Sequence, residues 1–163
     1  MTSNVRIGKS AQFFVVSFGG IVKDYLQSIL YKEIPLTQSM GIEVFVANEE
    51  QVILRAPLAK NINHKGTAFG GSLYSVMTLT GWSMANVLLK SAGIDAEVVI
   101  QDASIEYLLP VVSDFESVCL APDVSRFLLA VKKRKRGRLR LIVEIKIAER
   151  VAVKFHGSYV AEV

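Results

Sequence analysis

One segment of this 163-residue sequence combines residue types that can do chemistry. It reads Asn63-His64-Lys65-Gly66-Thr67-Ala68-Phe69-Gly70-Gly71-Ser72 and leads into a long run with helical spacing. Glycines at a helix start let a ligand approach the backbone, and the first N–H groups of a helix have no partner within it. The helix dipole adds a partial positive charge there. We interpret this helix start as a site that can polarise a carbonyl group, although two glycines can also serve only close packing against a sheet.

Four further side chains carry groups that could take part in a reaction. His64 precedes the glycines, and imidazole is a suitable general base near neutral pH; a plain surface histidine is the alternative. Asp102 lies in the middle of the predicted strand run 98–104, which otherwise suits a sheet interior, where a carboxylate is costly unless it is paired or lines a wet cleft; the alternative is an outward-facing residue at a sheet edge. We interpret His156 as a solvated strand residue and Cys119 as a buried, inert thiol. Two histidines and one cysteine far apart in sequence do not indicate a metal site, and we expect no cofactor.

Length and composition indicate one globular domain. The chain is too short for two ordinary domains, and 51% hydrophobic with 21% charged residues excludes a disordered tail or a fibrous repeat. This apolar content fits a subunit that buries one face against a copy of itself. A single cysteine permits no intrachain disulfide, which is typical of a reducing compartment, so we expect a cytoplasmic protein.

Residues 1–20 are predicted to form a leader, poorly ordered or extended, ahead of a domain over residues 21–163. The apolar stretch from Ala11 to Val22 is too short to span a bilayer, so we expect no membrane partner. Its basic flank, Arg6 and Lys9, leaves a secretion signal as an alternative, but no clear small-x-small cleavage site follows before Lys23 and Asp24.

Hydrophobic spacing predicts a helix near the start, one long helix and an otherwise β-rich chain. In order, it predicts a helix over 21–30 ended by Pro35, a hairpin of strands 42–46 and 52–56, a loop over 57–68, a helix over 71–92, strands 97–109 and 115–120, a short helix after Pro122, and strands 138–149 and 151–163. The helix over 71–92 is apolar nearly all round, as a buried helix is. We therefore predict an α+β protein of the hotdog type: a curved antiparallel sheet wrapped around one long central helix, with an N-terminal helix.

Several short motifs accompany the central segment. They are Glu33-Ile34-Pro35-Leu36-Thr37, Met40-Gly41-Ile42, Gly81-Trp82, Ile105-Glu106-Tyr107 with Pro110, Gly137-Arg138-Leu139 and Phe155-His156-Gly157 with Tyr159-Val160-Ala161. With them, the sequence from about residue 23 to the end resembles the hotdog-fold thioesterases, most closely the YiiD-type family that also occurs as a C-terminal domain fused to acetyltransferases. The central motif is fairly specific and the others support it.

The resemblance implies roles for individual residues. Better-studied acyl-CoA relatives have an Asn eight positions before the second glycine, which is Asn63 here. They often have a His before the glycine pair, where this sequence has Phe69. They also place an acidic general base or nucleophile seven positions into the helix, where this sequence has Thr78. Threonine cannot act as a base, so the usual carboxylate is missing from its usual place.

Together these observations predict a thioesterase that hydrolyses an acyl-CoA or acyl-carrier-protein thioester. The N–H groups of Gly71 and its neighbours would hold the carbonyl oxygen while His64 or Asp102 activates water. The predicted catalytic residues are Asn63, His64 and Asp102, and the predicted substrate-binding residues are Gly66, Thr67, Phe69, Gly70, Gly71, Ser72 and Thr78. The resemblance implies a site shared between subunits, in which Asn63 and His64 would work with Asp102 of a partner chain, and hence a homodimer or a dimer of dimers. A hotdog hydratase or dehydratase, and an acyl-CoA-binding module without activity, stay open as alternatives.

The charge of +4 is local, because seven of the 19 Lys and Arg residues lie between Lys132 and Arg140. A solvated turn explains such a cluster, and contact with the phosphates of CoA or with an acidic acyl carrier protein is the second interpretation. Nucleic acid is the third. No aromatic residue is interleaved with these charges, so we expect no nucleic-acid partner.

Overall fold

The computed structural model describes residues 10–163. Its helices are α1 (Ser10–Glu33), α2 (Leu36–Met40), α3 (Leu58–Asn61), α4 (Gly70–Ser91) and α5 (Ser125–Arg134). Its strands are β1 (Glu43–Ala47), β2 (Gln51–Ala56), β3 (Glu97–Tyr107), β4 (Phe115–Leu120), β5 (Arg136–Ile147) and β6 (Arg150–Glu162). Helix α1 begins at Ser10 instead of Ile21, so residues 10–20 of the predicted leader are helical and not extended; residues 1–9 of that leader lie outside the described part.

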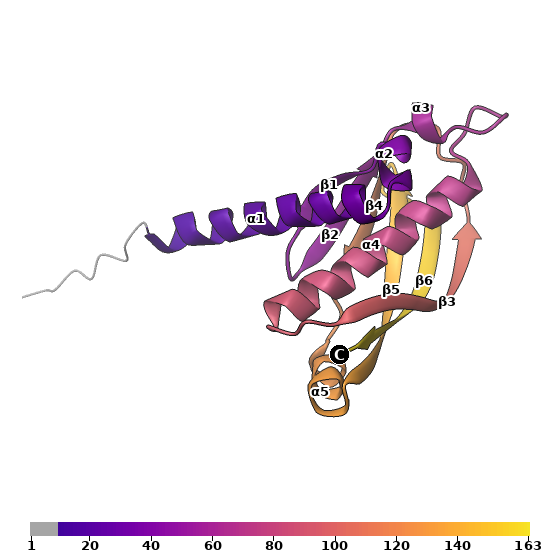
Figure 1. Cartoon of the computed structure of the whole chain (residues 1–163). Helices are drawn as coiled ribbons and strands as arrows, with labels where there is room; N and C mark the ends of the chain where they lie inside the picture. The colour runs from indigo at the N-terminus through magenta and orange to yellow at the C-terminus, as the bar shows by residue number, and fades with distance from the viewer. Residues whose placement is uncertain (1–9) are drawn as a thin grey trace, which may run out of the picture.

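The six strands form one antiparallel sheet in the order β1-β2-β4-β5-β6-β3. Figure 1 shows this sheet curving around α4, with α1 projecting to one side. The predicted α+β arrangement is thereby confirmed. Strands β1 and β3 are the two edges, and β3 is the longer of them with 11 residues against five.

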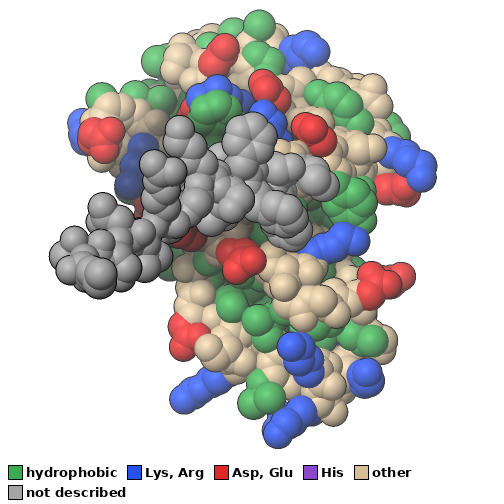
Figure 2. All heavy atoms as spheres, turned by 90° about the vertical axis from the view of Figure 1, so that its left-hand side faces the viewer, with side chains coloured by type: hydrophobic (Ala, Val, Ile, Leu, Met, Phe, Trp, Pro, Cys, Tyr) green, Lys and Arg blue, Asp and Glu red, His purple; other side chains and the backbone are tan. Residues whose placement is uncertain are grey.

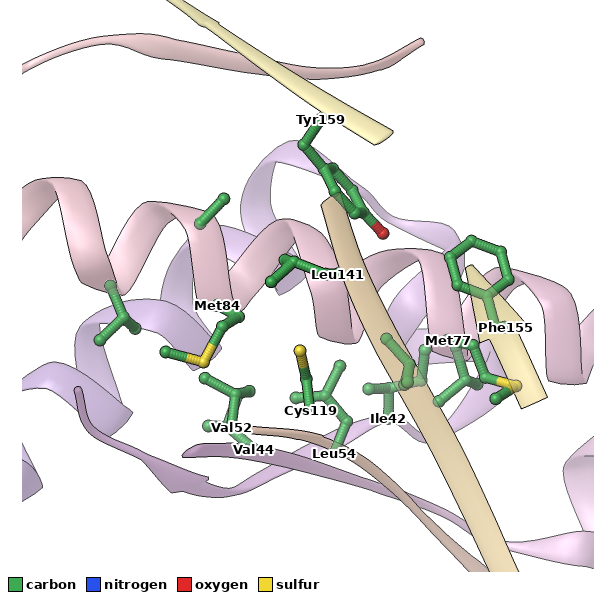
Figure 3. Packing of buried hydrophobic residues seen from close by; sticks show 14 of the residues in the cluster. Ile42, Val44, Val52, Leu54, Met77, Met84, Cys119, Leu141, Phe155 and Tyr159 are labelled. Carbon is green, nitrogen blue, oxygen red and sulfur yellow. The ribbon is translucent and has the colours of Figure 1, made fainter. Parts of the chain in front are cut away.

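The core lies between α4 and the concave face of the sheet. In β5 the side chains of Leu139, Leu141, Val143 and Ile145 are buried while Arg138 and Arg140 are exposed, which is the predicted alternation. Figure 3 shows Met77 and Met84 of α4 packed among strand residues, with the buried Cys119 of β4 between the two methionines.

Glycine at position 81 is required by Tyr159. The Tyr159 hydroxyl points toward α4 in Figure 3 and donates a 2.8 Å hydrogen bond to the Thr78 carbonyl. A Cβ added at Gly81 would lie 2.3 Å from the Tyr159 hydroxyl oxygen. This close approach therefore fixes how α4 sits on β6.

Gln27 ties α1 to the sheet. Its Oε1 accepts a hydrogen bond from the Val44 N–H at 2.6 Å, and its Nε2 donates to the Ile42 carbonyl at 3.3 Å. Pro35 follows the helix, and Leu36–Met40 forms the short helix α2, consistent with the predicted turn or cap. Within residues 10–163, no helix is long and apolar enough to cross a membrane.

Candidate functional site

The start of α4 presents free backbone donors. The N-cap residue Phe69 is extended (φ −66°, ψ 130°) and gives no side-chain cap, and the first helical hydrogen bond runs from the Leu73 N–H to the Phe69 carbonyl at 3.0 Å. Among the described residues, the N–H groups of Gly70, Gly71 and Ser72 therefore have no hydrogen-bond partner. Three donors at the positive end of a 22-residue helix can polarise a carbonyl oxygen placed before them.

The preceding loop is organised by Asn63. Its Oδ1 accepts from the N–H groups of Lys65 (2.8 Å) and Thr67 (3.2 Å), and its Nδ2 donates to the Thr67 hydroxyl at 2.9 Å. Gly66 has φ +79°, which favours glycine in this turn, and there is open space where a Cβ would lie. In the single chain the Asn63 amide is therefore occupied by its own loop.

Aromatic rings flank the glycine pair. A Cβ at Gly71 would lie 2.4 Å from the Phe69 ring, and a Cβ at Gly70 would lie 3.3 Å from the Tyr107 ring. The Tyr107 hydroxyl donates to the Gly70 carbonyl at 2.9 Å. Upstream, the Phe69 N–H donates to the Asn61 carbonyl at 2.7 Å. The glycines therefore serve close packing of these rings, while their N–H groups stay free.

A depression of about 330 Å³ lies beside the helix start. Its lining includes Thr67, Gly70, Leu73, Tyr107, Leu108 and Pro110. Among the described residues, this lining contains neither a carboxylate nor a histidine. Burial raises the pKa of Tyr107, so this phenol is protonated at neutral pH.

His64 is exposed and is not part of this lining. It belongs to the α3–α4 loop, which Figure 1 shows projecting from the end of the molecule where α4 begins. In the single chain the predicted base therefore lies near the helix start along the sequence but outside the depression.

Asp102 lies on the opposite face of the sheet from α4. It pairs with Ser158, and Ser158 pairs with Arg140, which is exposed between inward-facing leucines of β5. Because directly paired residues of an antiparallel sheet share a face, the Asp102 carboxylate points outward. Within the single chain it therefore does not face the start of α4, and it has the outward-facing edge position of the alternative interpretation. His156 is exposed on the same outer face, as expected, 3.9 Å from a Glu106 oxygen.

Thr78 lies about 12 Å along α4 from Gly70. Its hydroxyl oxygen is buried without a hydrogen-bond partner among the described residues. Ser72, in the first turn, is half-buried.

Sequence reasoning did not assign Tyr107 or Asn61 to the site. The alternation that places Ile105 inward also places Tyr107 inward and was a usable signal, whereas Asn61 lay in a predicted loop and gave none.

Comparison with known proteins gives consistent matches. Residues 23–163 match the family described as "Putative thioesterase (yiiD_Cterm)". The crystal structure of a "putative thioesterase" from Shewanella oneidensis is 31% identical, with a TM-score of 0.82 over 88% of this chain and 99% of that one. A protein of unknown function from Chlorobaculum tepidum is 29% identical, also with a TM-score of 0.82, over 86% of this chain and 94% of that one. A thioesterase from Haemophilus influenzae shares the fold at 15% identity and a TM-score of 0.68, over 85% of this chain and 89% of that one.

The family match covers the C-terminal part of α1 from residue 23, the hairpin, α4 and the remaining strands, and therefore the whole of the site around Gly70. The chain belongs to this yiiD_Cterm thioesterase family and adopts the hotdog fold.

Proposed function

We propose that this protein hydrolyses acyl thioesters carried by CoA or by an acyl carrier protein. The observation that carries the proposal is the uncapped start of α4, with three free N–H groups beside an apolar depression. The thioester oxygen would accept from the N–H groups of Gly70, Gly71 and Ser72. Negative charge then develops on that oxygen when water attacks, and fixed donors stabilise it.

Water activation is assigned to His64. Its side chain has no hydrogen bond or ion pair with any residue in 10–163, so it is free to turn toward a bound substrate. Imidazole accepts a proton readily near neutral pH. The Thr78 hydroxyl, which lacks a protein partner within the described residues, is proposed to contact the bound substrate.

Gly70 offers a matched pair of variants to test the donor role. Gly70→Pro removes one N–H, yet proline suits the first helical position and the preceding Phe69 is already extended, as a residue before proline must be. Gly70→Ala keeps the N–H. With release of free CoA from a panel of acyl-CoAs as the assay, we expect Gly70→Pro to lower kcat about 100-fold and Gly70→Ala far less. Equal rates in the two variants would remove the donor role, and no thiol release by the unaltered protein would remove the hydrolase proposal.

The lack of an acidic side chain in the described lining favours a second candidate, an acyl-CoA-binding module without turnover. Calorimetry separates the two. Tight binding of an acyl-CoA that is recovered intact would support the binding module.

We further propose that the protein is a homodimer joined through β3. This strand is a long edge, and Val99 (60%), Tyr107 and Leu108 (53% each) are apolar side chains left exposed on it or just beyond its end. A long, exposed, apolar edge is a template for pairing with another strand. A second copy is the natural partner because a two-fold axis makes antiparallel pairing of β3 with itself self-complementary.

A further inference from the structure

A second cavity lies between α1 and the far half of α4. It has a volume of about 400 Å³, within the range of small-molecule sites. Its walls are mainly apolar and include Val22, Leu26 and Ile29 of α1 together with Trp82, Val87 and Ile94. The polar side chains in the lining include those of Asn86, Lys90 and Asp95. The apolar walls suit a hydrocarbon chain, and the polar side chains suit contact with water.

The cavity is distant from the helix start of its own chain. Asn86 is 16 residues from Gly70 in α4, which corresponds to about 24 Å. A thioester held at Gly70 would therefore not reach the cavity of the same subunit with a short or medium acyl chain.

Two contacts show how α4 and β3 run past one another. The Tyr107 hydroxyl at the end of β3 meets the Gly70 carbonyl at 2.9 Å, and Trp82 Nε1 donates to the Val98 carbonyl at the start of β3 at 2.9 Å. Strand and helix are thus antiparallel neighbours. The cavity borders the Val98 end, because Trp82 and Ala96 both line it.

A second copy paired antiparallel through β3 exchanges these two ends. Its Tyr107 and Gly70 would lie beside the Val98 and Trp82 of the first copy, since a two-fold axis places the end of one strand next to the start of the other. The helix start of each subunit would then face the cavity of its partner. Both cavities would be open to a chain that enters from across the interface.

We propose that this cavity holds the acyl chain of a thioester whose carbonyl is bound at the start of α4 in the partner subunit. The inference rests on the proposed function and names its substrate class: straight-chain acyl groups long enough to leave the carbonyl site. Each methylene that enters the cavity is expected to raise kcat/KM about fourfold until the space is filled. Acetyl thioesters, which do not reach it, are expected to be the poorest substrates.

Filling the cavity from α1 tests the assignment. Ile29→Trp places an indole in it, and Ser28→Trp is the matched control because Ser28 is exposed on the adjacent position and does not line the cavity. The measurement is the ratio of kcat/KM for palmitoyl-CoA to that for acetyl-CoA, with circular dichroism melting and light scattering to check folding and assembly. We expect Ile29→Trp to lower the ratio at least tenfold and Ser28→Trp to leave it unchanged. Val22→Trp is the second cavity variant if Ile29→Trp does not fold.

Mixed dimers test whether the cavity serves the partner. A subunit carrying Gly70→Pro keeps its cavity, and one carrying Ile29→Trp keeps its helix start. Co-expressed with different tags and purified as a heterodimer, the pair contains one complete site only if carbonyl and chain bind on different subunits. We expect the heterodimer to hydrolyse palmitoyl-CoA faster than the homodimer of either variant. No recovery, or an unchanged chain-length ratio in the cavity variants, overturns the proposal.

Failure of hydrolysis is distinguishable from failure of this inference. If the unaltered protein releases no thiol from any acyl-CoA, the proposed function is lost, and the same variants are compared by calorimetric binding of palmitoyl-CoA. At least a tenfold loss of affinity in Ile29→Trp but not in Ser28→Trp would support the cavity as an acyl site, and equal affinities would overturn it.

Discussion

Two hydroxyl groups on α4 are buried without a hydrogen-bond partner among the described residues, those of Thr78 and Ser83. A buried, unsatisfied polar group costs about 1–3 kcal/mol, so such a group calls for an explanation. Thr78 is the position at which the related enzymes carry an acidic residue, and we propose that its hydroxyl is satisfied by substrate or water. Ser83 has no such role.

Replacing each hydroxyl group by a methyl group or a hydrogen tests whether Thr78, unlike Ser83, takes part in turnover. Thr78→Val is expected to raise the free energy of unfolding by about 1 kcal/mol without ligand, because it removes the unsatisfied hydroxyl and keeps the shape. It is also expected to lower kcat. Ser83→Ala is the control and should leave kcat unchanged. Thermal melts and thioester hydrolysis measure both effects; full activity of Thr78→Val would show that the hydroxyl takes no part in turnover.

The thiol of Cys119 makes stability depend on alkaline pH. Burial raises its pKa to about 12, whereas an unfolded thiol ionises near pH 8.5. The folded state therefore loses stability as pH rises from about 8.5 toward 12, because only the unfolded chain gains by ionising. The expected loss is about 1.4 kcal/mol per pH unit in that range. Urea titrations at a series of pH values should show that the free energy of unfolding falls less steeply with pH in Cys119→Ala than in the unaltered protein. Some pH dependence should remain because burial also raises the pKa of Tyr159. The same fall per pH unit in both proteins would contradict this account.

At the level of elements, periodicity predicted most of the fold because burial repeats with the geometry of each element. Strand β5 alternates without interruption, so its register and its inward face followed from the sequence. Strand β3 does not, because its pairing with β6 shifts between Ile100 and Asp102. An irregularity of one residue moves every later side chain of the strand to the other face, and no pattern in the run 98–104 marked it. This shift is why the face of Asp102, and with it one candidate base, could not be predicted.

The site was predictable in part for a similar reason. The glycine pair at a helix start signals free N–H groups directly, and the structure shows them. The inward face of Tyr107 could be predicted from the alternation at the end of β3, but its contact with Gly70, 37 residues earlier in the chain, depends on tertiary packing. Asn63 looked available in sequence but is occupied by its own loop.

The β3 edge carries a prediction about assembly. Val99 is 60% exposed in the single chain, so Val99→Lys should cost the fold little while placing a charge where a second β3 would pair. We expect a monomer by size-exclusion chromatography with light scattering, accompanied by loss of long-chain thioester hydrolysis. Leu120→Lys is the matched control, because Leu120 is 66% exposed on the central strand β4. A dimer in Val99→Lys, or a monomer in both variants, would place the interface elsewhere.

At the scale of the whole molecule, charge is concentrated at the end formed by α5 and the start of β5. We call Lys132, Lys133, Arg134, Lys135, Arg136, Arg138 and Arg140 the basic segment. All seven are exposed, and none forms an ion pair with another described residue. Figure 2 shows Lys and Arg side chains gathered at the bottom of the molecule, where α5 lies. The three basic residues in the last turn of α5 offset the dipole of that helix, which accounts for part of the cluster.

The remainder of the basic segment is best explained by an anionic carrier. In the sheet register, Arg136 of β5 lies opposite Glu162 of β6, and Glu162 lies opposite Glu97 at the start of β3. The basic segment therefore lies at the strand end that the proposed dimer brings toward the partner's helix start. Phosphates of CoA or an acidic carrier protein would meet it there. KM for acyl-CoA is therefore expected to rise several-fold between about 50 and 300 mM salt, whereas KM for the matching acyl-pantetheine, which lacks the nucleotide phosphates, should stay constant. Arg138→Gln with Arg140→Gln should flatten the salt dependence, and Lys60→Gln, at an exposed lysine of α3, should not. Parallel salt profiles for the two substrates would leave the basic segment as a solvated turn, because a carrier bound by charge has to release that binding when the charges are screened.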